Sequence, residues 1–141
     1  MKRKNITYIF VSVINVTIPL IVGLLWYLIF SRNSFPIISG YTPLEICLKL
    51  PNNFLTYFFR FCFADAMWAY SFFYSLMLVF FGYEKFPLIV LIFGIITVVL
   101  IEILQLWHII NGTFDIYDIV IEIIFGIIAI CNFHYTRRTI L

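Results

Sequence analysis

The chain has 141 residues, of which 64% are hydrophobic and only 11% are charged. Soluble domains contain about 45–50% apolar and about 25% charged residues, so this composition excludes an ordinary soluble protein and indicates an integral membrane protein. The formal net charge of +2 is too small to favour nucleic-acid binding. The three cysteines, Cys47, Cys62 and Cys131, form no CxxC pair, and we interpret them as packing residues. We expect one membrane domain over residues 1–141.

The first apolar run covers residues 6–30 and follows the basic cluster Lys2, Arg3 and Lys4. It contains no charged residue and exceeds the roughly 20 residues that cross a hydrocarbon core. It is too long for the apolar region of a signal peptide, and no A-x-A cleavage site follows it. The run therefore predicts a retained transmembrane helix.

A polar, proline-containing stretch over residues 31–53 predicts a loop. Within it, Thr42 is placed to cap a helix, Pro43 would occupy its first position and Glu45 would complete a capping box. Glu45 could also pair with Lys49 one turn later. We expect a short interfacial helix over about residues 43–50, in the first external loop.

Three further apolar runs follow, at about residues 54–81, 86–108 and 114–133. Residues 82–85 and the Asn111-Gly112-Thr113 turn separate them. The sequence thus predicts an all-α membrane protein, a bundle of four transmembrane helices.

Orientation follows from Lys and Arg, which collect in cytoplasmic flanks. One side of the predicted bundle holds six of these residues: Lys2, Arg3, Lys4, Lys85, Arg137 and Arg138. The other side holds Arg32 and Lys49, with Arg60 near its edge. We therefore expect both termini in the cytoplasm and the turn at residues 111–113 outside.

Carboxylates from three predicted helices fall in the same, outer half of the membrane. Counting about 1.5 Å per residue places Glu102 about 9 Å, Glu122 about 10 Å and Asp65 at most about 16 Å from the outer helix ends. Spacings of three and seven residues put side chains on one helix face. Three such faces are expected: Asp65 with Trp68 and Phe72, Glu102 with Gln105, and Asp115 with Asp118 and Glu122.

Intramembrane carboxylates are costly and normally pair with cations or line a wet cavity. Arg60 lies five residues from Asp65, on another face of the helix, and we expect it to reach outer head groups instead. His108 is the remaining nearby basic group. Because clustered carboxylates cannot all stay ionised in a low dielectric, some must be protonated or a cation must join them. We expect an acidic pocket that opens outward.

Structural roles are open alternatives for several of these residues. Asp115 could be only a helix cap, since Asp is common at helix N-termini. Glu102 and Gln105 could simply join neighbouring helices by hydrogen bonds, and Trp68 could pack rather than contact a ligand. Glu122 lies too deep to act as a cap.

Three segments together resemble the VanZ-like family of small bacterial membrane proteins: "FADAMWAYSF", "EILQ" and "GTFDIYDIVIE", within residues 50–130. The resemblance implies a multi-pass protein of the bacterial inner membrane, associated in some members with resistance to the glycopeptide teicoplanin. The matching polar positions are Asp65, Trp68, Glu102, Gln105, Gly112, Asp115 and Asp118. Many relatives carry asparagine at the position of Glu122, which puts in doubt a mechanism that needs a carboxylate there.

Three functions fit these observations. The leading hypothesis is a non-enzymatic envelope protein whose pocket binds a polar ligand or lipid head group, such as a lipid-linked cell-wall precursor or a glycopeptide, with no resident cofactor. A second is a metal-dependent enzyme acting on a polyprenyl-linked or phospholipid substrate. It would need Mg²⁺, Ca²⁺ or Mn²⁺ on Asp65, Glu102 and Asp118, with Glu102 as general acid or base.

The third function is a proton or cation carrier, because unpaired intramembrane acids often mark such paths. The cytoplasmic halves of the helices offer few polar residues for a route, and the visible ones are Ser71, Ser75 and Thr97. We therefore expect a one-sided pocket rather than a path through the membrane.

Overall fold

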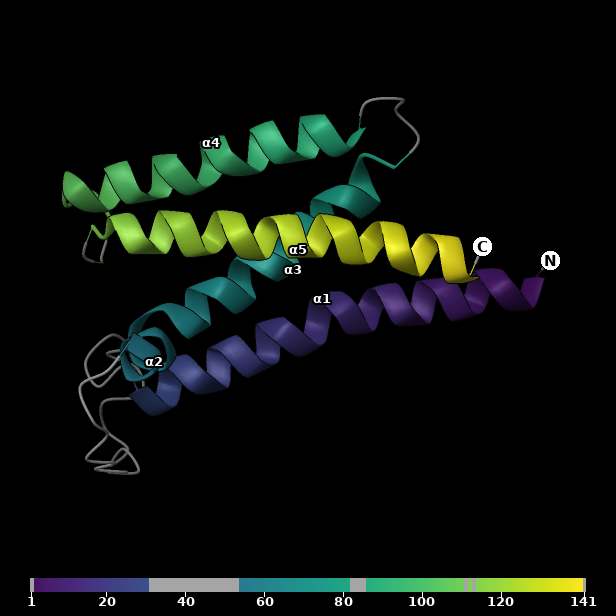
Figure 1. The fold of residues 1–141 in the computed structure, drawn as a ribbon, viewed down its shortest axis with the longest axis horizontal. Coiled ribbons are helices and arrows are strands. Elements are labelled where there is room, and N and C mark those ends of the chain that lie inside the picture. The colour runs from purple at the N-terminus through teal and green to yellow at the C-terminus, as the bar shows by residue number, and fades with distance from the viewer. Residues whose placement is uncertain (1, 31–53, 82–85, 111, 113, 141) are drawn as a thin grey trace.

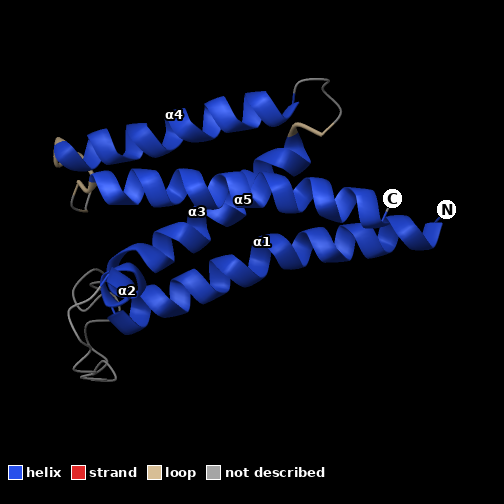
Figure 2. Cartoon of the chain, viewed as in Figure 1, coloured by secondary structure: helices blue, strands red, loops and turns tan. Residues whose placement is uncertain are grey.

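A computed structural model of the chain describes residues 2–30, 54–81, 86–110, 112 and 114–140. Within these ranges all regular structure is helical, with no strand (Figure 2). Three helices are long and apolar enough to cross a membrane, which agrees with the predicted class of all-α membrane protein. The predicted interfacial helix at residues 43–50 lies outside the described residues.

The first helix, α1, runs from Lys2–Phe30 and contains Pro19. It begins four residues before the predicted start, so the basic cluster that precedes the apolar run is itself helical. An apolar run marks only the part of a helix that suits lipid, and the helix can continue into the polar flank.

The second predicted helix is divided into three consecutive helical segments. These are α2 (Phe54–Tyr57), the π-helical segment η1 (Phe58–Cys62) and α3 (Phe63–Val79). The amide of Phe63 donates to the carbonyl of Phe58, five residues back, as expected in a π-helix. Helical structure therefore covers most of the predicted range. Over one turn the helix is π-helical and wider than an α-helix, and an apolar pattern cannot indicate this difference.

The last two helices are α4 (Phe86–Leu106) and α5 (Ile116–Ile140). The prediction ended the final helix at residue 133, seven residues too early. No glycine or proline follows residue 133 to stop it, and Arg137 and Arg138 lie in its last turn, where cations interact favourably with the helix dipole.

The central element is α3, which packs most extensively against α5 and α1. Helix α4 packs against α5 and α3 on the side away from α1 (Figure 1). Both chain termini lie at one end of the bundle, which we call the terminal end. The opposite end, where α1 and α4 finish and α3 and α5 begin, we call the distal end.

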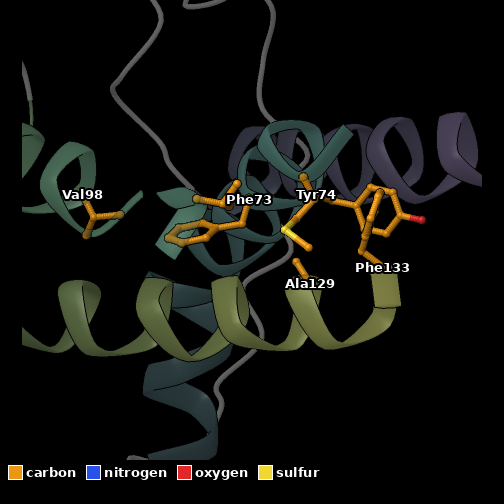
Figure 3. Packing of buried hydrophobic residues seen from close by; sticks show 7 residues of the cluster. Phe73, Tyr74, Val98, Ala129 and Phe133 are labelled. Carbon is orange, nitrogen blue, oxygen red and sulfur yellow. The ribbon is translucent and has the colours of Figure 1, made fainter. Parts of the chain in front are cut away.

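A small apolar core holds the helices together. Seven fully buried residues form it: Phe73, Tyr74, Met77, Val90, Val98, Ala129 and Phe133 (Figure 3). The Phe73 ring fits against two glycines, because a Cβ on Gly94 would lie 2.2 Å and one on Gly126 2.8 Å from its atoms. The large apolar side chains left exposed on α1, α4 and α5 suit a surface that faces lipid.

Candidate functional site

The predicted acidic residues gather at the distal end, where η1 and the first turns of α3 lie on one side of α5 and the last turns of α4 lie on its other side (Figure 1). Five of the seven acidic residues of the chain lie in this region: Asp65, Glu102, Asp115, Asp118 and Glu122. The bundle therefore brings together carboxyl groups from three helices, as the helical phase predicted.

Asp115 is a helix cap that also joins three elements. Its Oδ1 accepts a hydrogen bond from the amide of Tyr117, at 2.9 Å, and so caps α5. Its Oδ2 accepts from the hydroxyl of Tyr57 in α2, at 2.5 Å, and its own amide donates to Oε2 of Glu102 in α4, at 3.1 Å. Both oxygens of Asp115 are thus engaged, and the residue is better suited to hold the site together than to bind a ligand.

Glu102 and Glu122 are the most deeply buried of the five carboxylates, with exposed fractions of 3% and 6%. Glu102 accepts the hydrogen bond from the Asp115 amide. Glu122 makes no hydrogen bond or ion pair with any residue that the structure describes. It lies near enough to Asp65, Glu102 and Asp118 to feel the charge of all three.

Asp118 and Asp65 complete, with Glu102 and Glu122, an acidic cluster, which we call the acidic pocket after the pocket that the sequence predicts. One oxygen of Asp118, Oδ1, is buried without a hydrogen-bond partner among the described residues. Asp65 interacts electrostatically with Asp118 and Glu102. The four members repel one another, and removing a charge from water without a partner costs several kcal/mol in general.

Positive charge that could balance the pocket is missing from the described part of the chain. The Lys and Arg side chains that the structure describes, Arg137 and Arg138, lie at the terminal end. The predicted direction of the Arg60 side chain lies outside the described residues. His108 is exposed, with a left-handed backbone (φ 54°), and no hydrogen bond or ion pair of the described residues joins it to a carboxylate.

Two predicted site residues lie beside the pocket and contact other groups. The side chain of Gln105 lies against the backbone of Gly112, because a Cβ there would be 2.6 Å from its Cδ. Gly112 has a φ of 151°, which favours glycine. Trp68 stacks on Phe72, with ring centroids 5.2 Å apart, so the expected shared face of α3 is present and its aromatic residues contact each other.

Two residues of the site were not predicted. The thiol of Cys62, which is fully buried, lies within hydrogen-bonding reach of Asp118, so it is more than a packing residue. Tyr57 binds Asp115. The three-residue spacing of Cys62 from Asp65 was a usable signal, whereas the position of Tyr57 depends on η1.

The π-helical segment also changes the local hydrogen bonding near the pocket. The indole of Trp26 in α1 donates to the carbonyl of Phe59, which lies within η1. A π-helix inside a longer helix often occurs at functional sites. Here its last residue is Cys62, which contacts Asp118, so its extra width affects where Cys62 and Asp65 face.

A second polar network, also not predicted, joins α1, α3 and α5 in the terminal half of the bundle. The Tyr70 hydroxyl and the Asn132 amide group each donate to Oδ1 of Asn15, at 2.9 Å. Asn132 also donates to the Tyr70 hydroxyl, and Thr136 donates to Oδ1 of Asn132 at 3.4 Å. Single uncharged polar residues are common in apolar runs, so their positions alone do not predict a network.

The three polar residues that the sequence did offer for a path do not form one. Ser71, Ser75 and Thr97 each donate to a carbonyl four residues back in their own helix: Met67, Ser71 and Phe93. Such bonds satisfy a hydroxyl inside an apolar bundle without linking helices. Polar contact between helices in this half comes from Asn15, Tyr70 and Asn132 instead.

Comparison with known proteins finds no match to a family model, to a curated protein or to a solved structure. Among the described residues, no group of three or more His, Cys, Asp or Glu side chains is arranged to hold a metal ion.

Proposed function

We propose that the protein is a four-span membrane protein of the bacterial inner membrane, with both termini in the cytoplasm and the distal end outside. The segments α2, η1 and α3, of 4, 5 and 17 residues, are together long enough for the fourth crossing of a core about 30 Å thick. The excess of Lys and Arg at the terminal end supports the orientation.

The proposed function is binding of a polar ligand or lipid head group, through its positively charged part, in the outward-facing acidic pocket. The observation that carries this proposal is the burial of Glu102 and Glu122 beside the unpartnered oxygen of Asp118, with no described cation nearby. A cationic group of a ligand would supply the positive charge that the described side chains near the pocket do not. The pocket is then a binding site in which the positive charge belongs to the ligand.

The resemblance of the three sequence segments to VanZ-like proteins supports a role in the cell envelope. On that basis the ligand is a lipid-linked cell-wall precursor, a membrane lipid or a glycopeptide such as teicoplanin, and the protein lowers susceptibility to the antibiotic. Deleting the gene in its host should raise susceptibility, and the wild-type gene, but not a double Glu102→Gln, Asp118→Asn variant, should restore resistance.

A metal-dependent membrane enzyme is the second candidate. It is favoured by the concentration of carboxylate oxygens, which suit Mg²⁺, Ca²⁺ or Mn²⁺. Asp65, Glu102 and Asp118 would hold the ion, and Glu102 would be the acid or base. The engagement of Glu102 by the Asp115 amide argues for a positioning role instead, so binding is the preferred proposal.

A thermal-shift panel on the purified protein tests the binding proposal. The probes are Mg²⁺, Ca²⁺ and Mn²⁺, a polyamine, a polyprenyl phosphate and teicoplanin. A site that binds one of them stabilises the folded protein by about 2.7 kcal/mol at a hundred times the dissociation constant. We expect teicoplanin or the polyamine to raise the melting temperature, and Glu102→Gln and Asp118→Asn to remove the shift.

The matched control is Thr97→Val, because Thr97 bonds only within its own helix and the substitution keeps its shape. This variant should retain the wild-type shift. Stabilisation by metal ions alone would favour the enzyme over the binding protein. If no probe shifts the wild-type protein, or if the shifts persist in both carboxylate variants, the proposed pocket is not a binding site.

A further inference from the structure

Three buried hydroxyls in the terminal half of the bundle make no well-formed hydrogen bond to any described residue. They belong to Tyr8 and Ser12 in α1 and to Tyr74 in α3. Tyr74 is 0% and Ser12 only 4% exposed, so bulk solvent cannot satisfy them. Buried polar groups are almost always hydrogen-bonded, so three buried hydroxyls without a well-formed hydrogen bond in one region require an explanation.

Two of the three hydroxyls belong to tyrosine rings that contact the same side chain. The rings of Tyr8 and Tyr74 both contact the edge or face of the Phe133 ring, with centroids 6.4 and 5.5 Å away. Figure 3 shows Tyr74 alongside Phe133, with the tyrosine oxygen at the end of the ring. Tyr8 and Ser12 are one helical turn apart with their hydroxyls within hydrogen-bonding reach of each other, and the Tyr8 and Tyr74 hydroxyls interact electrostatically.

These residues also extend the polar network of Asn15, Tyr70 and Asn132. In α1, Tyr8, Ser12 and Asn15 are spaced by four and three residues and therefore share a face. In α3, Tyr70 and Tyr74 are one turn apart, and in α5 Asn132 and Thr136 are one turn apart. Three helices thus turn matching polar faces toward one another over about 10 Å along the bundle.

We propose that the hydroxyls of Tyr8, Ser12 and Tyr74 enclose a buried water site that extends this polar network toward the terminal end. A buried water needs two to four polar partners, and three hydroxyls from two helices supply them. Each hydroxyl can both donate and accept, so water satisfies all three, whereas a dry site would leave the Tyr74 hydroxyl unpaired in an apolar core and leave Tyr8 and Ser12 only each other.

The site is independent of the acidic pocket, which lies at the opposite end of the bundle. Its members carry no charge, and its ligand is neutral. Water there joins α1 to α3, because the three hydroxyls come from these two helices. The test below does not depend on whether the acidic pocket binds anything.

Radiolytic footprinting with X-rays tests the proposal on the whole protein in lipid nanodiscs, since a bound water produces hydroxyl radicals beside the side chains it touches. Phe133 and Phe73 are both 0% exposed, but Phe133 contacts the rings of Tyr8 and Tyr74, whereas Phe73 packs against Gly94 and Gly126. We expect Phe133 to be modified several-fold faster than Phe73. Equal rates would overturn the proposal.

Thermal unfolding of a Tyr74→Phe variant gives a second test with opposite signs for the two cases. If water occupies the site, the substitution removes one of its partners and lowers the melting temperature. If the site is dry, it removes an unpaired hydroxyl and raises the melting temperature, which contradicts the proposal. Should the variant fail to fold, the comparison of Phe133 with Phe73 in the wild-type protein decides alone.

Discussion

The hydrogen bonds of Asp115 predict that Asp115→Ala loosens the distal end of the bundle. The substitution removes the cap on the Tyr117 amide and the acceptor of the Tyr57 hydroxyl. A cap contributes about 1 kcal/mol to stability. A hydrogen bond to a charged group contributes about 1.5–3 kcal/mol, which we reduce to about 1 kcal/mol because Tyr57 is 37% exposed.

The expected loss is therefore about 2 kcal/mol, or a fall in melting temperature of about 4–8 °C for a chain of this size. Tryptophan fluorescence on heating in detergent measures it. Asp115→Asn should lose less than half as much, because asparagine caps helices as well as aspartate does. Tyr57→Phe should lose about 1 kcal/mol.

A double-mutant cycle isolates the contact between the two side chains. The variant with both Tyr57→Phe and Asp115→Ala should be no less stable than Asp115→Ala alone, because their shared bond is already lost. Additive effects of the two substitutions would show that the bond contributes nothing. An Asp115→Asn variant as unstable as Asp115→Ala would show that the cap is not the cause.

Three further substitutions follow from local geometry, and melting temperature measures each of them. Gly94→Ala should destabilise the bundle by about 1–3 kcal/mol through overpacking against Phe73, and adding Phe73→Leu should restore part of the loss; no recovery would show that the ring is not the obstacle. Gly112→Ala should also destabilise, because its positive φ strains any other residue and its Cβ would meet Gln105, so an unchanged melting temperature would contradict that conformation. His108→Gly should instead stabilise by up to about 1 kcal/mol, since His108 adopts a left-handed conformation that glycine adopts without strain; a lower melting temperature would mean that the imidazole has a stabilising contact.

The helices were predictable because lipid leaves little choice of backbone structure. Inside a membrane every backbone amide and carbonyl needs a partner, and a helix supplies these bonds within one segment. Apolar runs therefore located most of the ends of α1, α4 and α5 to within about one helical turn. The exception is the C-terminal end of α5, where polarity changes at residue 133 but nothing stops the helix before Ile140.

The gathering of carboxyl groups was predictable from helical phase and depth. Spacings of three and four residues place side chains such as Asp118 and Glu122 on one face of a helix, and Glu102 lies near the end of its own helix. Antiparallel packing of neighbouring helices then brings side chains at the same depth together. The same reasoning could not choose between the two roles of Asp115. Its capping bond is local, but the bond from Tyr57 depends on how two distant helices meet.

The sequence by itself determined the membrane class, the helical content and the face of each helix that carries acid, because these depend on solvent and on fixed helical geometry. Only the tertiary structure decided which uncharged groups contact the carboxyl groups and which helices share a polar network. The contact of Cys62, in the π-helical turn, with Asp118 and the contact of Asn15 with Tyr70 and Asn132 both join segments far apart in the chain. The helical period of 3.6 residues predicts which face of a helix a side chain occupies, but it does not predict which residue of another helix lies opposite that face.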